Sequence, residues 1–321
     1  MTLTELARLA HVSTSTASKA FAQSSEINQE TKEMIFEVAK QNGCFKKFYR
    51  AEYPGLSFAI ICPEFESTYY SVFIAEMQKY LAKYNSEVSV AVTGFDAEVE
   101  ERLIEYYERF HTVDGIILIN GHSNFKAKNE IPIATISCVT KSKPSINVKQ
   151  NLQIPIFEAV SRLHELGAES IGFIGEGYTI GKKRLTLDTV KKVYGEANED
   201  YFVTSHERFE RAGYLGALEL ISKGKLPRAI ICGYDSIALG AMRAFFEHGI
   251  KVPDDVAVIG IDDPPSSAYT TPSLSSISHQ TEETCKAVAS ALMAKIKGEE
   301  YPDTINIICK FNERESSKIK K

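Results

Sequence analysis

The sequence predicts an α/β protein in which a small N-terminal domain of three helices precedes a larger body with two parallel β-sheets. Within the first 45 residues, apolar side chains recur at helical spacing. After Pro54-Gly55 the pattern changes to continuous apolar strands that alternate with amphipathic helices, which is typical of parallel sheets covered on both faces. The alternation runs through two consecutive rounds, so we expect two similar lobes with a cleft between them.

The N-terminal domain has the pattern of a helix-turn-helix. Its expected core comprises Leu6, Leu9, Ala10, Val12, Ala17 and Phe21. A third helix is expected from about Gln29. Ser13 stands where the N-cap hydroxyl of the second helix is expected, and His11 occupies the tight turn, since histidine is among the residues that tolerate a positive φ. A domain of this kind typically places its second helix in the major groove of DNA.

The outer face of the second helix is almost wholly hydrogen-bonding. Its polar residues are Ser13, Thr14, Ser15, Thr16, Ser18 and Lys19. Short hydroxyl side chains and a lysine can reach base edges or phosphate oxygens, and the N-terminus of a helix suits a phosphate. The alternative interpretation is a solvated polar face on an ordinary three-helix bundle.

Composition and charge are those of a globular protein with several units. With 321 residues, of which 25% are charged, two or three compact units are expected. No apolar run approaches the ~20 residues that span a bilayer, and the N-terminus lacks a signal-peptide pattern, so we expect a cytoplasmic protein without a membrane segment. The net charge is −5, but the first 50 residues carry seven Lys or Arg against five Glu, which favours DNA contact by this part only.

Nothing in the sequence predicts catalytic chemistry. The six cysteines are Cys44, Cys62, Cys138, Cys232, Cys285 and Cys309. They form no C-x-x-C pair and mostly lie in apolar runs, so we interpret them as reduced core residues rather than as a metal site. The stretch 175–183 has the spacing of neither a dinucleotide loop nor a P-loop. We expect it to be a cleft loop in which Lys182 and Lys183 are available to an anionic ligand. No catalytic residue, metal or cofactor is therefore predicted.

The first round of the body begins with a buried strand at 56–62. The helix expected at 71–84 has one apolar face, made of Phe73, Met77, Tyr80, Leu81 and Tyr84. A strand at 87–93 follows, and apolar residues from Val99 to Phe110 predict the next helix. Strands at 115–120 and 133–137 complete the round.

The second round repeats this order of elements. Helices are expected at 152–166, about 184–193, 208–221 and 236–248, and strands at 170–174, 201–204, 229–232 and 256–261.

Five stretches distributed along the chain carry a more specific pattern. They are residues 2–21, 114–118, 163–175, 234–263 and 271–277, of which 234–263 is the most diagnostic. By these stretches the chain resembles the lactose-repressor (LacI/GalR) family of transcription regulators. The resemblance implies a periplasmic-binding-protein-like body and the following boundaries: a helix-turn-helix domain at 1–45, a hinge at 46–55, and a body at 56–321. Within the body it implies a first lobe at about 56–150 and 280–300, and a second lobe at about 151–277 and 303–315.

The resemblance also implies a mechanism and partners. A homodimer binds a near-palindromic operator in double-stranded DNA, with one N-terminal domain on each half-site. A small metabolite, usually a sugar or a nucleoside-type compound, binds between the lobes and changes the affinity for DNA. The protein is then a regulator, expected to be a repressor, and not an enzyme.

Residue roles in DNA binding follow from the family pattern. Thr14, Ser15 and Lys19 correspond to the base-contacting positions, and Lys19 replaces the more usual arginine, which loses the bidentate fork that reads guanine. The other predicted DNA contacts are Ser13, Thr16, Ser18 and Thr31.

Five residues are predicted to bind the effector. Arg184 and Asp262 correspond to the family's ligand-binding positions, and an arginine with an aspartate suits a polyhydroxylated ligand. Tyr234 replaces the usual asparagine and offers a face for stacking on a sugar, while Tyr69 and Tyr70 follow the first strand. The alternative is that Asp262 and Asp263 merely shape a turn. The neighbouring Asp235 is expected to be the N-cap of its helix.

The hinge departs most from the family pattern. Phe48 or Tyr53 is a candidate wedge between DNA base steps. The alternative, which we favour, is a basic linker with Lys46, Lys47 and Arg50 near the phosphates.

Two other function classes compete with a regulator. One is a cytoplasmic α/β enzyme that acts on a sugar or nucleotide and uses its N-terminal helices for oligomerisation. The other is a sugar-binding protein like the exported proteins of two-lobed fold. Binding to a palindromic duplex that weakens steeply with salt is expected of the regulator alone.

Overall fold

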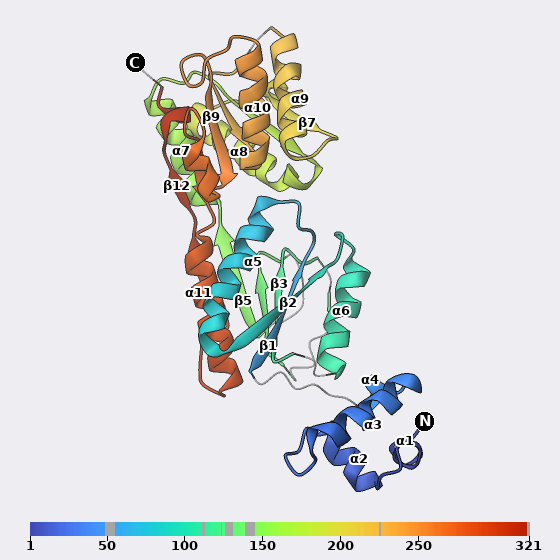
Figure 1. The fold of residues 1–321 in the computed structure, drawn as a ribbon. Helices are drawn as coiled ribbons and strands as arrows, with labels where there is room; N and C mark the ends of the chain where they lie inside the picture. The colour runs from blue at the N-terminus through green and yellow to red at the C-terminus, as the bar shows by residue number, and fades with distance from the viewer. Residues whose placement is uncertain are drawn as a thin grey trace. The chain divides into compact units, whose positions relative to one another are not determined.

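The computed structural model describes residues 1–48, 55–110, 113–122, 124–125, 131–138, 145–224 and 226–319. Contacts divide the chain into two compact units, Met1–Pro54 and Gly55–Lys321, which we call the head and the body. The two units are drawn in Figure 1 and are described separately. No helix in the described ranges is both long enough and apolar enough to cross a membrane.

The head contains the three expected helices and a short fourth one. They are α1 (Leu3–Leu9), α2 (Thr14–Phe21), α3 (Gln29–Gln41) and α4 (Phe45–Phe48). Side-chain caps begin the first three: Thr2 forms a capping box with Glu5, and Ser13 and Asn28 accept backbone hydrogen bonds from the third residue of their helices. His11 has a φ of 53° in the turn, which confirms the predicted positive φ.

An aromatic cluster closes the small core of the head. The ring of Phe21 lies 5.2 Å from Phe36 and 5.7 Å from Phe48, and Leu6 and Ile35 are fully buried beside it. The expectation that Leu9 belongs to this core is wrong, because its side chain is 44% exposed.

The first lobe of the body is a parallel sheet with the strand order β11-β5-β4-β3-β1-β2. The strands are β1 (Leu56–Cys62), β2 (Ser86–Val92), β3 (Gly115–Ile119), β4 (Ile133–Ile136), β5 (Ile146–Asn151) and β11 (Thr304–Ile308). Helices α5 (Thr68–Leu81) and α11 (Thr281–Ile296) cover one face and α6 (Ala97–Phe110) the other. Alternate residues of β1 accordingly enter two different clusters: Phe58 and Ile60 pack toward α5 and α11, and Ala59 and Ile61 toward α6.

The second lobe has the strand order β12-β10-β9-β8-β6-β7. Its strands are β6 (Ile171–Glu176), β7 (Phe202–Ser205), β8 (Ala229–Cys232), β9 (Ala257–Asp262), β10 (Ser275–Ser278) and β12 (Lys310–Asn312). All neighbours are parallel except the edge strand β12, which runs antiparallel to β10. The covering helices are α7 (Gln153–Glu165), α8 (Ile180–Tyr194), α9 (Phe209–Ser222) and α10 (Asp235–Glu247).

Short 3-10 helices complete the described structure. They are η1 (Ala82–Tyr84), η2 (Gly177–Thr179), η3 (Glu199–Tyr201), η4 (Pro265–Tyr269) and η5 (Glu315–Ser317). The predicted fold class, a three-helix head before two parallel sheets, is confirmed.

The C-terminal segment corrects one predicted lobe boundary. Residues 303–315 were expected in the second lobe, but β11 pairs with β5 as the edge strand of the first sheet. The reason is proximity: α11 packs on this sheet, and the short connection after it delivers the chain to the nearest free edge. The chain therefore crosses between the lobes after β5, after β10 and after β11.

Helix α5 begins earlier than predicted. It starts at Thr68, with Ser67 as its N-cap, instead of at residue 71. Tyr69 and Tyr70 consequently lie in the first turn of a helix at the end of β1, where they are held more rigidly than they would be in a loop.

Candidate functional site

Helix α2 presents its predicted DNA contacts on one side of the head. Ser13, Thr14, Ser15 and Ser18 are exposed, and Thr16 and Lys19 are half-buried. The opposite side packs inward through Ala17, Ala20 and Phe21. The Ser13 hydroxyl accepts the Thr16 N–H at 3.0 Å, so the cap that begins the helix also sets the direction of its first turn.

Lys19 has a partner that the sequence analysis missed. Its ammonium forms an ion pair with Glu26, which lies between α2 and α3, and the two side chains are 44% and 65% exposed. Lys19 is the one charged residue of α2. Because exposed ion pairs contribute little to stability, a phosphate or a base edge can replace Glu26 at small cost. A carboxylate three residues before the third helix was visible in the sequence, but its pairing depends on the turn.

Thr31 lies away from α2, in the first turn of α3. Its backbone N–H is held by the Asn28 side chain at 2.8 Å, and its side chain is half-buried.

Of the hinge candidates, the structure describes only Phe48 in full. It packs against Phe21 inside the head, so it is not free to act as the wedge considered above. Arg50 and Tyr53 lie outside the described residues, as do the side chains of Lys46 and Lys47.

A cavity of about 330 Å³ lies between the two lobes of the body. The first lobe contributes Tyr69, Tyr70, Phe95, Asn120, Ser137 and Gln150. The second lobe contributes Tyr178, Lys182, Tyr234 and Asp262. His279 enters from the segment that crosses between the lobes after β10. The cavity thus combines several aromatic rings with convergent polar groups, as small-molecule sites do.

The polar centre of the cavity is Asp262. Its Oδ1 lies 3.5 Å from Lys182 Nζ and 3.3 Å from His279 Nε2. Lys182 also donates to the Gly233 carbonyl at 2.9 Å and lies 4.3 Å from the ring centre of Tyr234. The lysine charge is therefore balanced by one carboxylate at the cavity wall.

The tyrosines are neutral hydrogen-bonding groups. The hydroxyl of Tyr69 donates to Gln150 Oε1 at 3.2 Å, and that of Tyr70 accepts from Asn120 at 3.0 Å. Burial raises the pKa of Tyr69, Tyr70 and Tyr234 well above the ordinary value. Their hydroxyls consequently keep their protons at physiological pH.

A larger hollow of about 760 Å³ lies beside this cavity and shares Tyr69 and Asp262 with it. Its border carries Glu76, Glu282 and Glu283 against Lys286. The smaller cavity is the candidate ligand site, because aromatic rings and polar residues at the ends of strands line it.

Two family models match the chain. Residues 2–43 match bacterial regulatory proteins of the lacI family, and residues 160–317 match the periplasmic binding protein-like domain. The chain belongs to the lacI family of regulators. It is accordingly a DNA-binding transcription regulator, and the predicted family is confirmed.

Individual relatives match almost the whole length of this lacI-family chain. The ribose operon repressor of Haemophilus influenzae is 27% identical over 308 residues, which cover 92% of each chain. The HTH-type transcriptional regulator AscG of Escherichia coli is 25% identical and covers 94% of this chain and 93% of its own.

Solved structures share the fold. A Lac repressor dimer bound to operator and the anti-inducer ONPF matches with a TM-score of 0.68 and 18% identity, covering 99% of both chains. The regulator CelR in complex with cellobiose has a TM-score of 0.67 and 22% identity, covering 98% of this chain and 99% of its own.

The structure does not bring Arg184 into the cavity of this family member. Its side chain is 85% exposed and lies 4.0 Å from Asp188, one turn further along α8. The helical period explains the difference, because Lys182, Thr186 and Thr189 occupy the inner side of α8 and Arg184 the outer side. The cationic group at the cavity is Lys182, one of the two lysines that the sequence makes available to an anionic ligand. The expectation of a loop is wrong at this position, because α8 begins at Ile180.

Several lining residues were not predicted. Asn120 follows β3, Ser137 follows β4, and Gln150 is near the end of β5. All lie at the carboxyl ends of parallel strands, where ligands bind in open α/β sheets, so this rule would have found them. His279 and Phe95 carried no such signal, because their positions depend on the crossing segment and on a loop.

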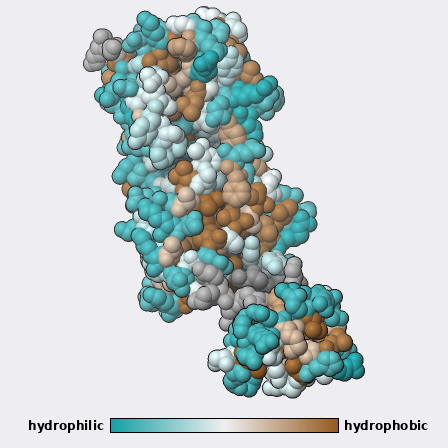
Figure 2. Space-filling view, in the orientation of Figure 1, coloured by the Kyte–Doolittle hydropathy of each residue, from teal (hydrophilic) through white to brown (hydrophobic). Residues whose placement is uncertain are grey.

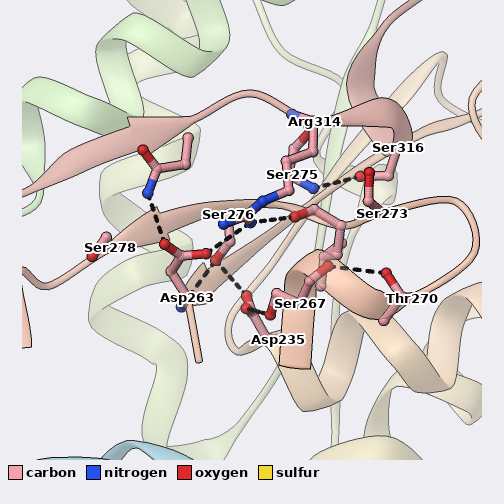
Figure 3. Close-up of polar contacts among 12 residues, drawn as sticks. Asp235, Asp263, Ser267, Thr270, Ser273, Ser275, Ser276, Ser278, Arg314 and Ser316 are labelled. Carbon is pink, nitrogen blue, oxygen red and sulfur yellow. Dashed lines mark hydrogen bonds and ion pairs between the residues drawn. The ribbon is translucent and has the colours of Figure 1, made fainter. Parts of the chain in front are cut away.

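Asp235 is not the N-cap of α10. The N-cap is Tyr234, and its side chain makes no capping bond. The Asp235 carboxylate instead points inward and accepts from the hydroxyls of Ser267 at 2.5 Å and Ser276 at 2.6 Å (Figure 3). It thereby ties α10 to β10 and η4 beneath the end of β9.

The adjacent aspartates have separate tasks. Asp263 faces the second-lobe sheet, where it accepts from Asn312 at 2.7 Å and pairs with Arg314 at 2.7 Å (Figure 3). Asp262, with a φ of 123°, turns the other way and lines the cavity. Asp263 thus ties the end of β9 to the C-terminal segment, while Asp262 lies at the cavity wall.

Proposed function

We propose that this regulator is a repressor whose affinity for its operator is set by a small polyhydroxylated metabolite, a sugar, bound between the lobes. The observation that carries the proposal is the cavity centred on Asp262, Lys182 and His279 and walled by tyrosines. Carboxylate, ammonium and imidazole groups exchange hydrogen bonds with hydroxyls, while aromatic rings cover the apolar faces of a sugar.

The proposed effector contacts are Tyr69, Tyr70, Tyr234, Asp262 and Lys182. The positive charge at the cavity has its own carboxylate partner, which favours an uncharged ligand over a phosphorylated one. Names among the similar proteins, a ribose operon repressor and a cellobiose complex, support a sugar.

The proposed operator contacts are polar residues of α2, its N-cap Ser13, and Thr31 of α3. Thr14, Ser15 and Lys19 reach base edges, and Ser13, Thr16, Ser18 and Thr31 reach phosphates. The boundaries 1–45 for the DNA-binding domain, 46–55 for the hinge and 56–321 for the body belong to the same proposal.

We propose that two copies act together as a homodimer on a near-palindromic site. Figure 2 shows apolar residues gathered on one face of the first lobe, in the region of β2. This strand is an edge of its sheet, and Val92 on it is 42% exposed. Contiguous exposed apolar surface typically marks a protein interface.

The proposed operator contacts are tested by measuring the affinity of the protein for duplexes from the genomic neighbourhood of the gene. The affinity is measured over a series of salt concentrations, with a scrambled duplex as the reference. We expect Lys19→Ala to reduce the affinity for the operator about 5-fold or more, because a base-edge contact contributes roughly 1–3 kcal/mol. The ratio of operator to scrambled affinity should fall with it.

Lys40→Ala is the matched control. Lys40 is also exposed and paired with a glutamate, Glu37, but lies on α3, and its substitution should leave the ratio unchanged. An unchanged affinity of Lys19→Ala for every duplex would refute the assignment of α2 as the recognition helix.

A further inference from the structure

We propose that Arg208 is a positioning residue that latches the two lobes together at the wall of the inter-lobe cavity. The latch consists of Arg208, Glu64 and Glu176 with the stacked rings of Phe95 and Tyr178. The inference rests on the proposed function of the cavity as a ligand site and describes how access to that site is controlled.

The guanidinium of Arg208 joins the lobes directly. Arg208 precedes α9 in the second lobe, and Glu64 follows β1 in the first. Nη1 and Nη2 of Arg208 donate to the two carboxylate oxygens of Glu64 at 2.5 and 2.9 Å. A bidentate arginine–carboxylate pair is among the stronger polar contacts in proteins and is specific in its geometry.

A second carboxylate orients the arginine from its own lobe. Nε of Arg208 donates to Glu176 Oε2 at 3.2 Å, and Glu176, at the end of β6, is only 1% exposed. Burial raises the pKa of Glu176, and the arginine opposes that shift. Because Glu176 is held by a central strand, the guanidinium is fixed in position before it meets Glu64.

Aromatic stacking continues the latch toward the cavity. The Phe95 ring of the first lobe stacks on the Tyr178 ring of the second, with centres 4.0 Å apart and planes inclined by 16°. The Arg208 guanidinium carbon lies 4.9 Å from the centre of the Tyr178 ring, within the range of a cation–π contact. Phe95 and Tyr178 both line the cavity.

The charged part of the latch stands apart from the ligand site. Glu64, Glu176 and Arg208 are not among the described residues that line the cavity, so they hold the lobes without occupying ligand space. The aromatic part forms a wall that must separate when a molecule enters from this side. Weakening the charged part should therefore open the wall, while the groups proposed to bind the ligand stay in place.

The sequence contains no tryptophan, so a single introduced tryptophan is a local fluorescent reporter. Tyr178→Trp places a single indole between the lobes, stacked on Phe95. Tyr178 is already 55% exposed with the latch closed, so the measurement is the additional quenching of the indole fluorescence by acrylamide when the ring face stacked on Phe95 is uncovered. Neither an effector nor DNA is present, so the result does not depend on whether the cavity binds a sugar.

In the Tyr178→Trp background, we expect Arg208→Gln to raise the quenching rate constant about 1.5-fold, because one ring face is uncovered, and to shift the emission to the red. The matched control is Arg211→Gln, since Arg211 is also paired with a glutamate, Glu207, but on the exposed side of α9. This control should match the parent.

Glu64→Gln tests the same latch from the other lobe and should raise quenching as Arg208→Gln does. Circular dichroism will show whether Arg208→Gln folds, and Glu64→Gln still tests the latch if Arg208→Gln does not. Quenching of folded Glu64→Gln or Arg208→Gln variants equal to that of the Arg211→Gln control would overturn the latch. If the latch holds but no sugar binds the body in calorimetry, the proposed function fails and the latch does not.

Discussion

Neighbouring aspartates in the second lobe differ because of what surrounds each side chain. Asp235 is buried beneath the turn, Asp263 pairs with Arg314, and Asp262 faces the cavity. Burial raises the pKa of Asp235 to about 7, although the hydrogen bonds from Ser267 and Ser276 oppose the shift. The same residue type therefore serves as a buried acid, a structural ion and a proposed ligand contact.

The raised pKa of Asp235 predicts how stability depends on pH. In the unfolded chain the pKa is about 4, so between about pH 4 and 7 the folded body binds a proton that the unfolded chain has released. Its stabilising contribution is fully present below pH 4 and is lost as the pH rises through about 7, by up to about 4 kcal/mol. Asp235→Asn should flatten this part of the curve, measured as the free energy of unfolding in urea between pH 5 and 8.

Asp188→Asn is the control for this measurement, because Asp188 is 66% exposed. It should keep the slope of the parent. If Asp235→Asn also kept that slope, Asp235 would not be the titrating group.

At the scale of elements, glycines decide how closely α9 and α10 approach each other. A methyl group on Gly240 of α10 would overlap the Glu210 carbonyl of α9, and one on Gly213 of α9 would overlap the Ile237 carbonyl of α10. These helices cover one face of the second sheet, and α10 starts beside Tyr234 of the cavity.

Gly240→Ala should destabilise the body by about 1–3 kcal/mol, because the obstacle is backbone and the helices must separate. The control is Gly181→Ala in α8, where an added methyl group meets nothing within 4 Å. Removing a glycine from a helix at no steric cost should leave stability equal or slightly higher. Urea unfolding of both variants measures the difference, and equal midpoints would contradict the packing argument.

At the scale of the whole molecule, the proposed function is a linkage between two sites in two units. An effector that changes operator affinity by some factor must have its own affinity changed by the same factor when operator binds. The latch at Arg208 lies within the body, where it biases the arrangement of the lobes. Operator contacts and effector contacts should therefore be separable by substitution.

Asp262→Asn should lower the affinity for the effector at least 10-fold, since Asp262 lines the cavity. It should leave the operator affinity without effector unchanged, since Asp262 is not among the proposed operator contacts. A thermal-shift panel of sugars, phosphosugars and nucleosides selects the effector. Calorimetry with that sugar then measures the effector affinity, and titration with the duplex measures the operator affinity. Asp263→Asn is not a suitable control, because it breaks the ion pair with Arg314. Unchanged sugar affinity of Asp262→Asn would remove it from the site.

Local sequence pattern alone was enough to predict the helices of the head and most helices and strands of the body. The cap at Ser13, the turn at His11 and the apolar period of the helices involve residues within a few positions of each other, so they are legible in the chain. The alternation of apolar strands with helices likewise defined two parallel sheets. The effector residues were implied by the resemblance to the family instead, and four of the five, Tyr69, Tyr70, Tyr234 and Asp262, line one cavity.

The features that the sequence did not predict depend on contacts between segments that are distant in the chain. The rotation of α8 about its axis places Lys182 at the cavity and Arg184 in solvent. Because α11 packs on the first sheet, β11 pairs with that sheet. Arg208 and Glu64 lie 144 positions apart in sequence, and Asp235 meets Ser267 and Ser276 only when the sheet is assembled. Short-range preferences specify elements, but the burial and pairing that give a charged side chain its role arise only when those elements pack together.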